Sequence, residues 1–111
     1  MTGKIEIKRL VPGDGKNFPQ YGQIVRVHYT AMFQETKMKI DSSRDRGAPF
    51  EFKVGAGEVI RAWDLCLPSL SVGERALISA PPHEAYGSSG IPGLIPPNAK
   101  LIFDIQLLAL K

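Results

Sequence analysis

The chain has 111 residues, of which 43% are hydrophobic and 23% are charged, and its formal net charge is +3. This composition is typical of one globular domain, 1–111, with enough apolar residues to form a core. No apolar run approaches the ~18 residues of a membrane span, the first residues do not resemble a signal peptide, and the basic residues are scattered. We therefore expect no membrane segment and no nucleic-acid partner. Because Cys66 is the single cysteine, we also expect a reducing, cytoplasmic compartment.

Alternating apolar and polar residues predict strands in the first half of the chain. The pattern indicates an opening strand at 5–7 and a longer strand at 23–33, which has the clearest alternation in the sequence. The polar segment 34–37 would link the second strand to an antiparallel partner at 38–41. The following segment, 42–49, is polar and rich in turn-forming residues, so we expect a loop or a bulge there.

One segment has the periodicity of a helix rather than of a strand. From about Glu58 its apolar residues recur at spacings of roughly three and four and share one face: Val59, Ile60, Trp63, Leu67 and Leu70. Pro68 should end this helix near Leu67, because proline lacks the N–H that a helix interior needs. Trp63, the single tryptophan, has a large flat apolar surface that can either seal a core or floor a pocket. The residues by themselves leave both roles open.

The remainder of the chain predicts strands at 50–54, 75–80 and 101–110. The last of these would carry four apolar residues on one face: Leu101, Phe103, Ile105 and Leu107. The segment 81–97 contains five prolines and three glycines, so it cannot be strand. Loops of this length are uncommon in compact domains and are often functional. The predicted fold class is α+β, with an antiparallel sheet of about five strands curled over one short helix.

Several reaction classes lack the residues that they require. The chain has no Gly-rich phosphate loop and no group of histidine, cysteine and carboxylate at ligand spacing, so we expect neither a cofactor nor a metal. His28 is predicted to be a surface or hydrogen-bonded strand residue, and Cys66 a buried, inert thiol. Asp41 lies among large apolar residues and needs donors, for which Tyr29 and Arg46 are the candidates. Such a pairing is equally compatible with a purely structural role.

A set of short motifs occurs in one order along the chain. The motifs are Val27-His28-Tyr29-Thr30, Asp41-Ser42-Ser43-Arg44-Asp45-Arg46, Pro49-Phe50, Glu58-Val59-Ile60-Arg61, Trp63, Ser71-Val72-Gly73-Glu74, Ala85-Tyr86-Gly87 and Ile95-Pro96-Pro97. Together, over nearly the whole chain, they resemble the FKBP-type peptidyl-prolyl isomerases, the immunophilins that bind tacrolimus and rapamycin. The resemblance implies five or six antiparallel strands around one helix, in a single-domain cytosolic monomer without a cofactor. It also implies acceleration of X–Pro rotation in peptides and proteins, and binding of macrolides that are then presented to a second protein.

The resemblance further implies a pocket between the helix and the sheet, floored by Trp63 and covered by the loop 81–97. Catalysis would involve the backbone N–H of Ile60 and the hydroxyl of Tyr86, which would bind carbonyl oxygens. Asp41 would be the polar catalytic group at the pocket edge, held by its two neighbours. The full set implied to bind substrate or drug is Tyr29, Ile40, Asp41, Arg46, Phe50, Glu58, Val59, Ile60, Trp63, Tyr86, Ile91, Leu94, Ile95 and Phe103.

The chain departs from the family's pattern at several positions. Ile40 stands where the family usually has phenylalanine, which removes a ring from one pocket wall. Ala31, Ala62 and Cys66 occupy places that are often glycine, and Ala62 is expected to crowd the pocket entrance. The link 34–37 lacks the glycine common at that turn. The alternative function is a proline-motif binding or scaffolding module with weak or no catalysis, and a third is a basic docking surface that rests on the +3 charge alone.

Overall fold

The computed structural model describes residues 4–111, whose strands form one antiparallel six-stranded sheet. The strands are β1 (Glu6–Val11), β2 (Ile24–Phe33), β3 (Lys39–Ser42), β4 (Phe50–Lys53), β5 (Arg75–Ala80) and β6 (Leu101–Leu110). The α-helices are α1 (Ser43–Arg46) and α2 (Arg61–Cys66), and the 3₁₀ turns are η1 (Leu67–Ser69) and η2 (Pro82–Glu84). In this part of the chain, neither α-helix has the length and apolar character needed to cross a bilayer.

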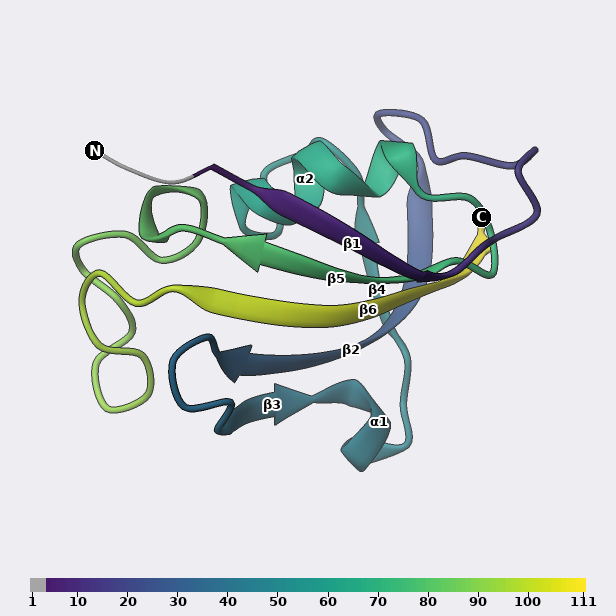
Figure 1. The fold of residues 1–111 in the computed structure, drawn as a ribbon. Helices are drawn as coiled ribbons and strands as arrows, with labels where there is room; N and C mark the ends of the chain where they lie inside the picture. The colour runs from purple at the N-terminus through teal and green to yellow at the C-terminus, as the bar shows by residue number, and fades with distance from the viewer. Residues whose placement is uncertain (1–3) are drawn as a thin grey trace.

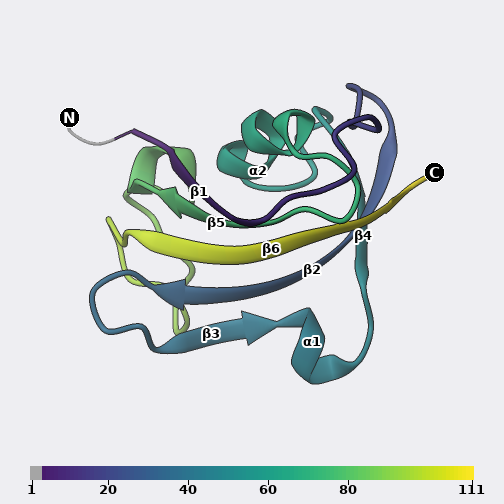
Figure 2. The same ribbon diagram turned by 45° about the vertical axis from the view of Figure 1, so that its right-hand side comes forward.

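The strand order in the sheet is β1-β5-β6-β2-β3, and β4 pairs with β2 beyond the end of β3. The sheet curves, and α2 lies across one of its faces, as Figures 1 and 2 show. This arrangement confirms the predicted α+β fold, with a sheet wrapped around one short core helix.

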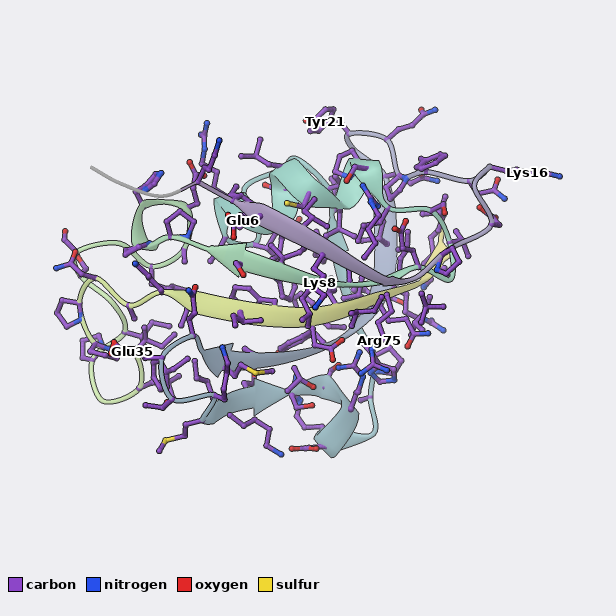
Figure 3. All side chains as sticks on the ribbon, in the orientation of Figure 1. Glu6, Lys8, Lys16, Tyr21, Glu35 and Arg75 are labelled. Carbon is purple, nitrogen blue, oxygen red and sulfur yellow. The ribbon has the colours of Figure 1, made fainter. Side chains whose placement is uncertain are left out.

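The core lies between α2 and the sheet. Along β6 the side chains alternate between buried and half-buried, and the buried ones are the four that the sequence pattern predicts: Leu101, Phe103, Ile105 and Leu107. Strands β2 and β5 add buried residues by the same alternation, and α2 and η1 add Trp63, Cys66 and Leu67 from the other side. Charged side chains occupy the opposite face of the sheet, where Glu6, Lys8 and Arg75 are labelled in Figure 3.

Helix α2 starts later than its apolar periodicity predicts. Ile60 is the N-cap residue with extended backbone (ψ 154°), so Val59 and Ile60 precede the helix rather than belong to it. The Asp64 carboxylate accepts hydrogen bonds from the N–H groups of Gly55 and Gly57, at 2.9 and 3.1 Å, and thereby ties the preceding turn to the helix. The predicted effect of Pro68 is confirmed, because α2 ends at Cys66 and the proline falls inside η1.

The segment 42–49, predicted to be a loop or a bulge, contains the short helix α1, so that prediction was wrong. Ser42 caps this helix by accepting a hydrogen bond from the Asp45 N–H at 3.3 Å. Gly47 ends it in the left-handed region with φ 67°. A serine three residues before an acidic residue, with glycine soon after, is a recognised signal for a helical turn. The turn-rich composition of the segment obscured that signal.

Two predictions about single residues are confirmed. The Nδ1 atom of His28 lies 2.9 Å from the Ser43 hydroxyl, so this histidine is a hydrogen-bonded strand residue. Cys66 is buried, and burial raises the pKa of its thiol to about 11. Because the thiolate is the reactive form, a thiol with this pKa is almost entirely protonated at neutral pH and is a poor nucleophile.

The missing glycine in the link 34–37 has a structural consequence at Lys37. This lysine adopts a left-handed conformation with φ 62°, which costs an L-residue roughly 1–2 kcal/mol. We predict that Lys37→Gly raises the free energy of unfolding by about 0.5–1 kcal/mol, since glycine avoids most of that cost but loses more entropy on folding. Urea unfolding followed by Trp63 fluorescence measures the change.

Lys37→Ala is the matched control, because it removes the same side chain and its hydrogen bond to the Gln34 carbonyl while keeping the strained backbone. The alanine variant should therefore be no more stable than the wild type. A Lys37→Gly variant that is no more stable than Lys37→Ala would contradict the assignment of strain to this residue.

Candidate functional site

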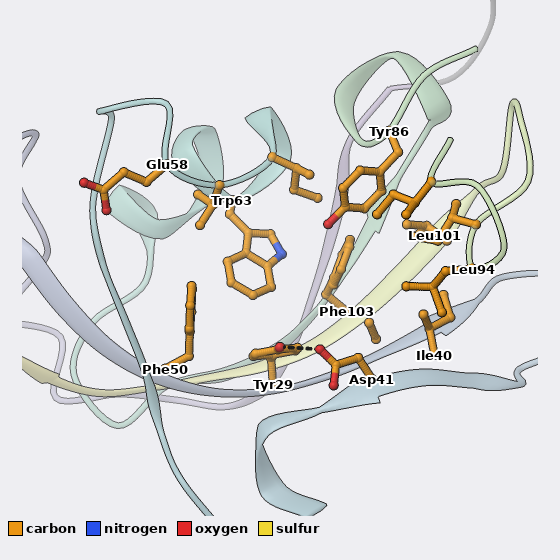
Figure 4. Close-up of a pocket in the computed structure, with 15 residues that line it drawn as sticks. Tyr29, Ile40, Asp41, Phe50, Glu58, Trp63, Tyr86, Leu94, Leu101 and Phe103 are labelled. Atoms are coloured by element: carbon orange, nitrogen blue, oxygen red, sulfur yellow. Dashed lines mark hydrogen bonds between the residues drawn. The ribbon is translucent and has the colours of Figure 1, made fainter. Parts of the chain in front are cut away.

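A cavity of about 280 Å³ opens between α2, the concave face of the sheet and the loop 81–97, which we call the flap. Its walls come from β2, β3, β4 and β6, from the turn before α2, from α2 itself and from the flap (Figure 4). The lining residues are Tyr29, Ala31, Ile40, Asp41, Phe50, Glu58, Val59, Ile60, Trp63, Tyr86, Ile91, Leu94, Ile95, Leu101 and Phe103. Most of these side chains are apolar, so the cavity offers a ligand mainly hydrophobic contact.

Trp63 forms the aromatic base of the cavity and is only 5% exposed. Its ring meets those of Tyr29 and Phe103 edge-on, with centroid distances of 5.1 and 5.4 Å, and it also contacts Phe50 and Phe52 at 6.1 and 5.6 Å. Such pairs contribute about 0.5–1.5 kcal/mol each beyond the area that they bury. Because its partners come from three different strands, the indole is held firmly at the base of the cavity.

A register shift brings two adjacent residues of β3 to the same cavity. Ala31 of β2 pairs with Asp41 and Met32 pairs with Lys39, which leaves Ile40 without a direct partner. Neighbouring side chains on a regular strand point to opposite faces, and a bulge removes that alternation. Ile40 and Asp41 can therefore both line the cavity.

Asp41 is held by the donors that the sequence predicted. The Tyr29 hydroxyl donates a hydrogen bond to its Oδ2 at 2.7 Å, Arg46 forms an ion pair with it, and the Ser42 N–H donates to its Oδ1 at 2.8 Å. Arg46 also donates to the Tyr29 oxygen at 3.0 Å. The Tyr29 hydrogen bond, followed by Arg46, lowers the pKa of Asp41 below its ordinary value. Burial, followed by the hydrogen bond to Asp41, raises the pKa of Tyr29.

Hydrogen-bond donors of cavity-lining residues that have no partner among residues 4–111 include the Tyr86 hydroxyl, the backbone N–H of Ile60 and the buried Nε1 of Trp63. The Tyr86 hydroxyl points into the cavity (Figure 4), and burial, together with the nearby charge of Asp41, raises its pKa. The backbone N–H of Ile60, at the N-cap of α2, also has no partner in the described chain. Free donors in an apolar cavity can bind carbonyl oxygens.

The cavity brings together nearly all of the residues that the sequence analysis proposed. Arg46 is the exception, because it does not line the cavity and only contacts two residues that do, Asp41 and Tyr29. Sequence reasoning missed Ala31 and Leu101, although strand alternation could have found both, since Ala31 follows Tyr29 by two residues and Leu101 precedes Phe103 by two.

The expectation that Ala62 crowds the pocket entrance was wrong. Its side chain is completely buried in the core and is not part of the cavity lining. Consecutive residues of a helix point about 100° apart, so a neighbour of Trp63 faces a different surface.

The flap has its own internal structure. Its backbone forms an isolated bridge between Ile91 and Ile95, with N–H to O distances of 2.8 Å in both directions. Gly90 has φ 60°, and a Cβ at this position would lie 2.2 Å from the Ile95 carbonyl oxygen, so no larger residue fits without a shift. Among residues 4–111, no group of three or more histidine, cysteine or carboxylate side chains is arranged to hold a metal ion.

The fold and the cavity together define a small α+β protein with a mainly apolar cavity that also carries hydrogen-bond donors. Comparison with known protein families identifies the family within this class. The family model for FKBP-type peptidyl-prolyl cis-trans isomerases matches residues 15–108, and the chain belongs to this family of enzymes.

Relatives of similar length support the assignment. The chain is 54% identical to FK506-binding protein 1 of Eremothecium gossypii over 108 residues, which covers 97% of this chain and 94% of the relative. It is 56% identical to FK506-binding protein 1 of Debaryomyces hansenii, with 96% and 93% covered, and 51% identical to that of Saccharomyces cerevisiae, with 97% and 94% covered.

The Asp41 network yields a prediction about pH. The pKa of Asp41 is lower in the folded state than in the unfolded chain, so the ionised carboxylate stabilises the fold above the unfolded pKa. That contribution is lost as the pH falls through the lowered folded-state pKa. Because the Tyr29 hydrogen bond is the largest cause, we predict that Tyr29→Phe raises the pKa of Asp41 towards its ordinary value.

The carboxyl ¹³C shift of Asp41, followed by NMR from pH 2 to 7, measures this pKa. Tyr21→Phe is the matched control, because Tyr21 is 70% exposed and has no hydrogen bond to Asp41. An unchanged or lower pKa in Tyr29→Phe would refute the proposed cause.

Proposed function

We propose that this cavity accelerates cis/trans rotation of X–Pro bonds in peptides and proteins, without a cofactor or metal. The observation that carries the proposal is an apolar cavity with Trp63 at its base, lined by residues whose donors, the Ile60 N–H and the Tyr86 hydroxyl, have no partner in the part of the chain that the structure describes. Membership of an isomerase family supports the same reaction.

An apolar cavity suits this reaction for a physical reason. Rotation about a peptide C–N bond has a barrier of about 18–20 kcal/mol, because planarity gives the bond partial double-bond character. The twisted transition state loses this resonance, so its carbonyl oxygen carries less charge than that of the planar amide. A water-poor cavity therefore stabilises the twisted form relative to the planar form, and only such a difference increases the rate. Each ~1.4 kcal/mol of difference is a tenfold change in rate.

In the proposed complex, the proline ring packs on Trp63 between Tyr29, Phe50 and Phe103. The Ile60 N–H and the Tyr86 hydroxyl donate hydrogen bonds to carbonyl oxygens of the peptide and hold it while the bond rotates. Asp41 stays ionised at the cavity edge, since its pKa is lowered. The aliphatic residues of β3 and the flap, Ile40, Ile91, Leu94 and Ile95, favour an apolar residue before proline.

We also propose that the cavity binds macrolides of the tacrolimus and rapamycin type. The named relatives are FK506-binding proteins, and the lining of the cavity is mainly apolar. The bound drug would be presented to a second protein from the rim formed by the flap. We infer that the chain acts as a single domain, a monomer in the cytoplasm, and the buried, unpaired Cys66 is consistent with a reducing compartment.

A second candidate function is a module that binds proline-containing segments with weak or no catalysis. Ile40 is the residue that favours it, because an aliphatic side chain stands where the resemblance leads us to expect an aromatic ring. A binder of this kind would saturate with a proline peptide but would leave its cis/trans exchange rate unchanged.

The proposed reaction is tested by NMR exchange spectroscopy on a short peptide with an apolar residue before proline. We expect catalytic amounts of the pure protein to accelerate cis/trans exchange and a tacrolimus-type macrolide to block the acceleration. Saturable binding without acceleration would support the binding module, and neither binding nor acceleration would refute both functions.

The polar assignments predict the effects of two variants. Asp41→Leu and Tyr86→Phe should each lower kcat/KM, by about 3–30-fold, because each removes a polar group at the rotating peptide, while circular dichroism remains that of the wild type. Tyr21→Phe is the matched control for the loss of a hydroxyl, since Tyr21 lies on the surface outside the cavity lining (Figure 3). Wild-type rates in both site variants would mean that these roles are misassigned.

The floor assignment predicts the effect of Trp63→Leu. We expect macrolide affinity to fall by at least about tenfold, because the smaller side chain removes the flat aromatic surface and several ring contacts. Calorimetric titration of the variant with the macrolide measures this loss, and thermal unfolding checks that the variant is folded. Unaltered tight binding would contradict the role of Trp63 as the floor.

A further inference from the structure

The flap is almost disconnected from the rest of the protein in its polar contacts. Its backbone hydrogen bonds join partners within the flap and the adjoining Asn98, including Gly87 N–H to the Pro82 carbonyl at 2.7 Å and Asn98 N–H to the Gly87 carbonyl at 2.9 Å, so 81–98 is treated as one segment. Apolar packing attaches it to the core, mainly through Ile95, which is 5% exposed. Within residues 4–111, no hydrogen bond joins this segment to another part of the chain.

One ion pair makes the missing polar connection. The Nε atom of Arg61, the first residue of α2, lies 2.9 Å from the Oε2 atom of Glu84 at the end of η2. Arg61 directly follows Ile60, and Glu84 precedes Tyr86 by two residues. The ion pair thus joins the segment that carries the Ile60 N–H to the segment that carries the Tyr86 hydroxyl.

This pair differs from an ordinary surface ion pair, which contributes about 0–1 kcal/mol. The Arg61 side chain is 69% exposed, but that of Glu84 is only 16% exposed. The Glu84 Oε2 atom is buried, and no donor from residues 4–111 reaches it with hydrogen-bond geometry, so the charge of Arg61 is its main compensation. His83 lies 3.7 Å from the other carboxylate oxygen, but it belongs to η2 and is itself part of the flap, so it does not connect the flap to the helix.

We propose that Arg61 and Glu84 are positioning residues that lock the base of the flap to the start of α2. The lock keeps the Tyr86 hydroxyl at a set distance from the Ile60 N–H before a substrate enters. The backbone between the lock and Tyr86 supports this role, because Ala85 has φ −126° and ψ −112°, outside the regular helical and extended regions. A tethered Glu84 stabilises that conformation, and an untethered flap base would relax and turn Tyr86 away.

The proposal predicts a particular kinetic pattern, and it rests on the proposed isomerase function. If the lock is lost, only a fraction of the free enzyme has Tyr86 in place, and apparent affinity falls by that fraction. Bound substrate restores the arrangement, so turnover of the complex changes little. A merely structural role would instead reduce the amount of folded protein, which lowers the apparent kcat and leaves KM unchanged.

The experiment measures KM and kcat for wild type, Arg61→Gln, Glu84→Gln and the double variant at low ionic strength. We expect Arg61→Gln to raise KM about three- to fivefold with kcat within about twofold. The double variant should be closer to wild type than Arg61→Gln, because the single change leaves a half-buried carboxylate without its cation. Salt should raise the KM of wild type and have little effect on the double variant.

The charge-reversed pair Arg61→Glu with Glu84→Arg tests the interaction itself and should recover most of the KM that Arg61→Glu alone loses. Arg26→Gln is the matched control, because Arg26 is an exposed arginine in a 2.8 Å ion pair with Glu51, between β2 and β4 and away from the flap. We expect its KM and kcat to equal those of wild type.

The outcomes separate this inference from the proposed function. Three results with an active wild type would each overturn the lock and leave the isomerase function standing. They are an unchanged KM in Arg61→Gln, a fall in the kcat of Arg61→Gln without a change in KM, and a change in Arg26→Gln as large as that in Arg61→Gln. A wild type that binds a proline peptide without catalysis would refute the isomerase proposal. The same variants, read out by peptide Kd from Trp63 fluorescence, would then decide whether the lock exists.

Discussion

The indole of Trp63 packs edge-on against rings from β2 and β6 and beside two rings from β4, and this contact holds α2 on the concave face of the sheet. The same indole is the base of the cavity, so the contact that closes the core also builds the site. A six-residue helix is too short to be stable alone, and its packing against the sheet is what fixes it in place. Core stability and site geometry therefore depend on one side chain.

Polar groups around the cavity fall into two kinds. Asp41 is satisfied by Tyr29, Arg46 and the Ser42 N–H, whereas the Ile60 N–H and the Tyr86 hydroxyl have no partner in the described chain. The first kind holds a charge in one place at the cavity edge. The second kind is available to a ligand. In the function proposed above, such a cavity would hold an amide by its carbonyl groups and exclude water around the bond that rotates.

The flap combines internal order with few external attachments. Its turns are bonded to one another, and within residues 4–111 it is connected to the body of the protein by apolar packing, mainly of Ile95, and by one ion pair. A segment that is attached in this way can shift as a unit at small cost in free energy, because its own hydrogen bonds survive the movement. That property suits a cover that must admit a peptide chain and then surround it. The ion pair restrains the movement at the end nearest to Tyr86.

The sequence by itself determined the strands β5 and β6, the segment that contains the core helix and the end of α2 at Pro68, because strand alternation, helical spacing and proline chemistry are local properties of the chain. Nearly all of the cavity lining was implied by the resemblance to a known family, through the order of its motifs. Only the tertiary structure decided that Ile60 precedes α2, that a bulge turns Ile40 and Asp41 to one cavity, and that Ala62 faces the core. It also revealed the contact between Arg61 and Glu84. Register, helix orientation and ion pairs across elements arise from contacts between distant segments, and no local pattern encodes them.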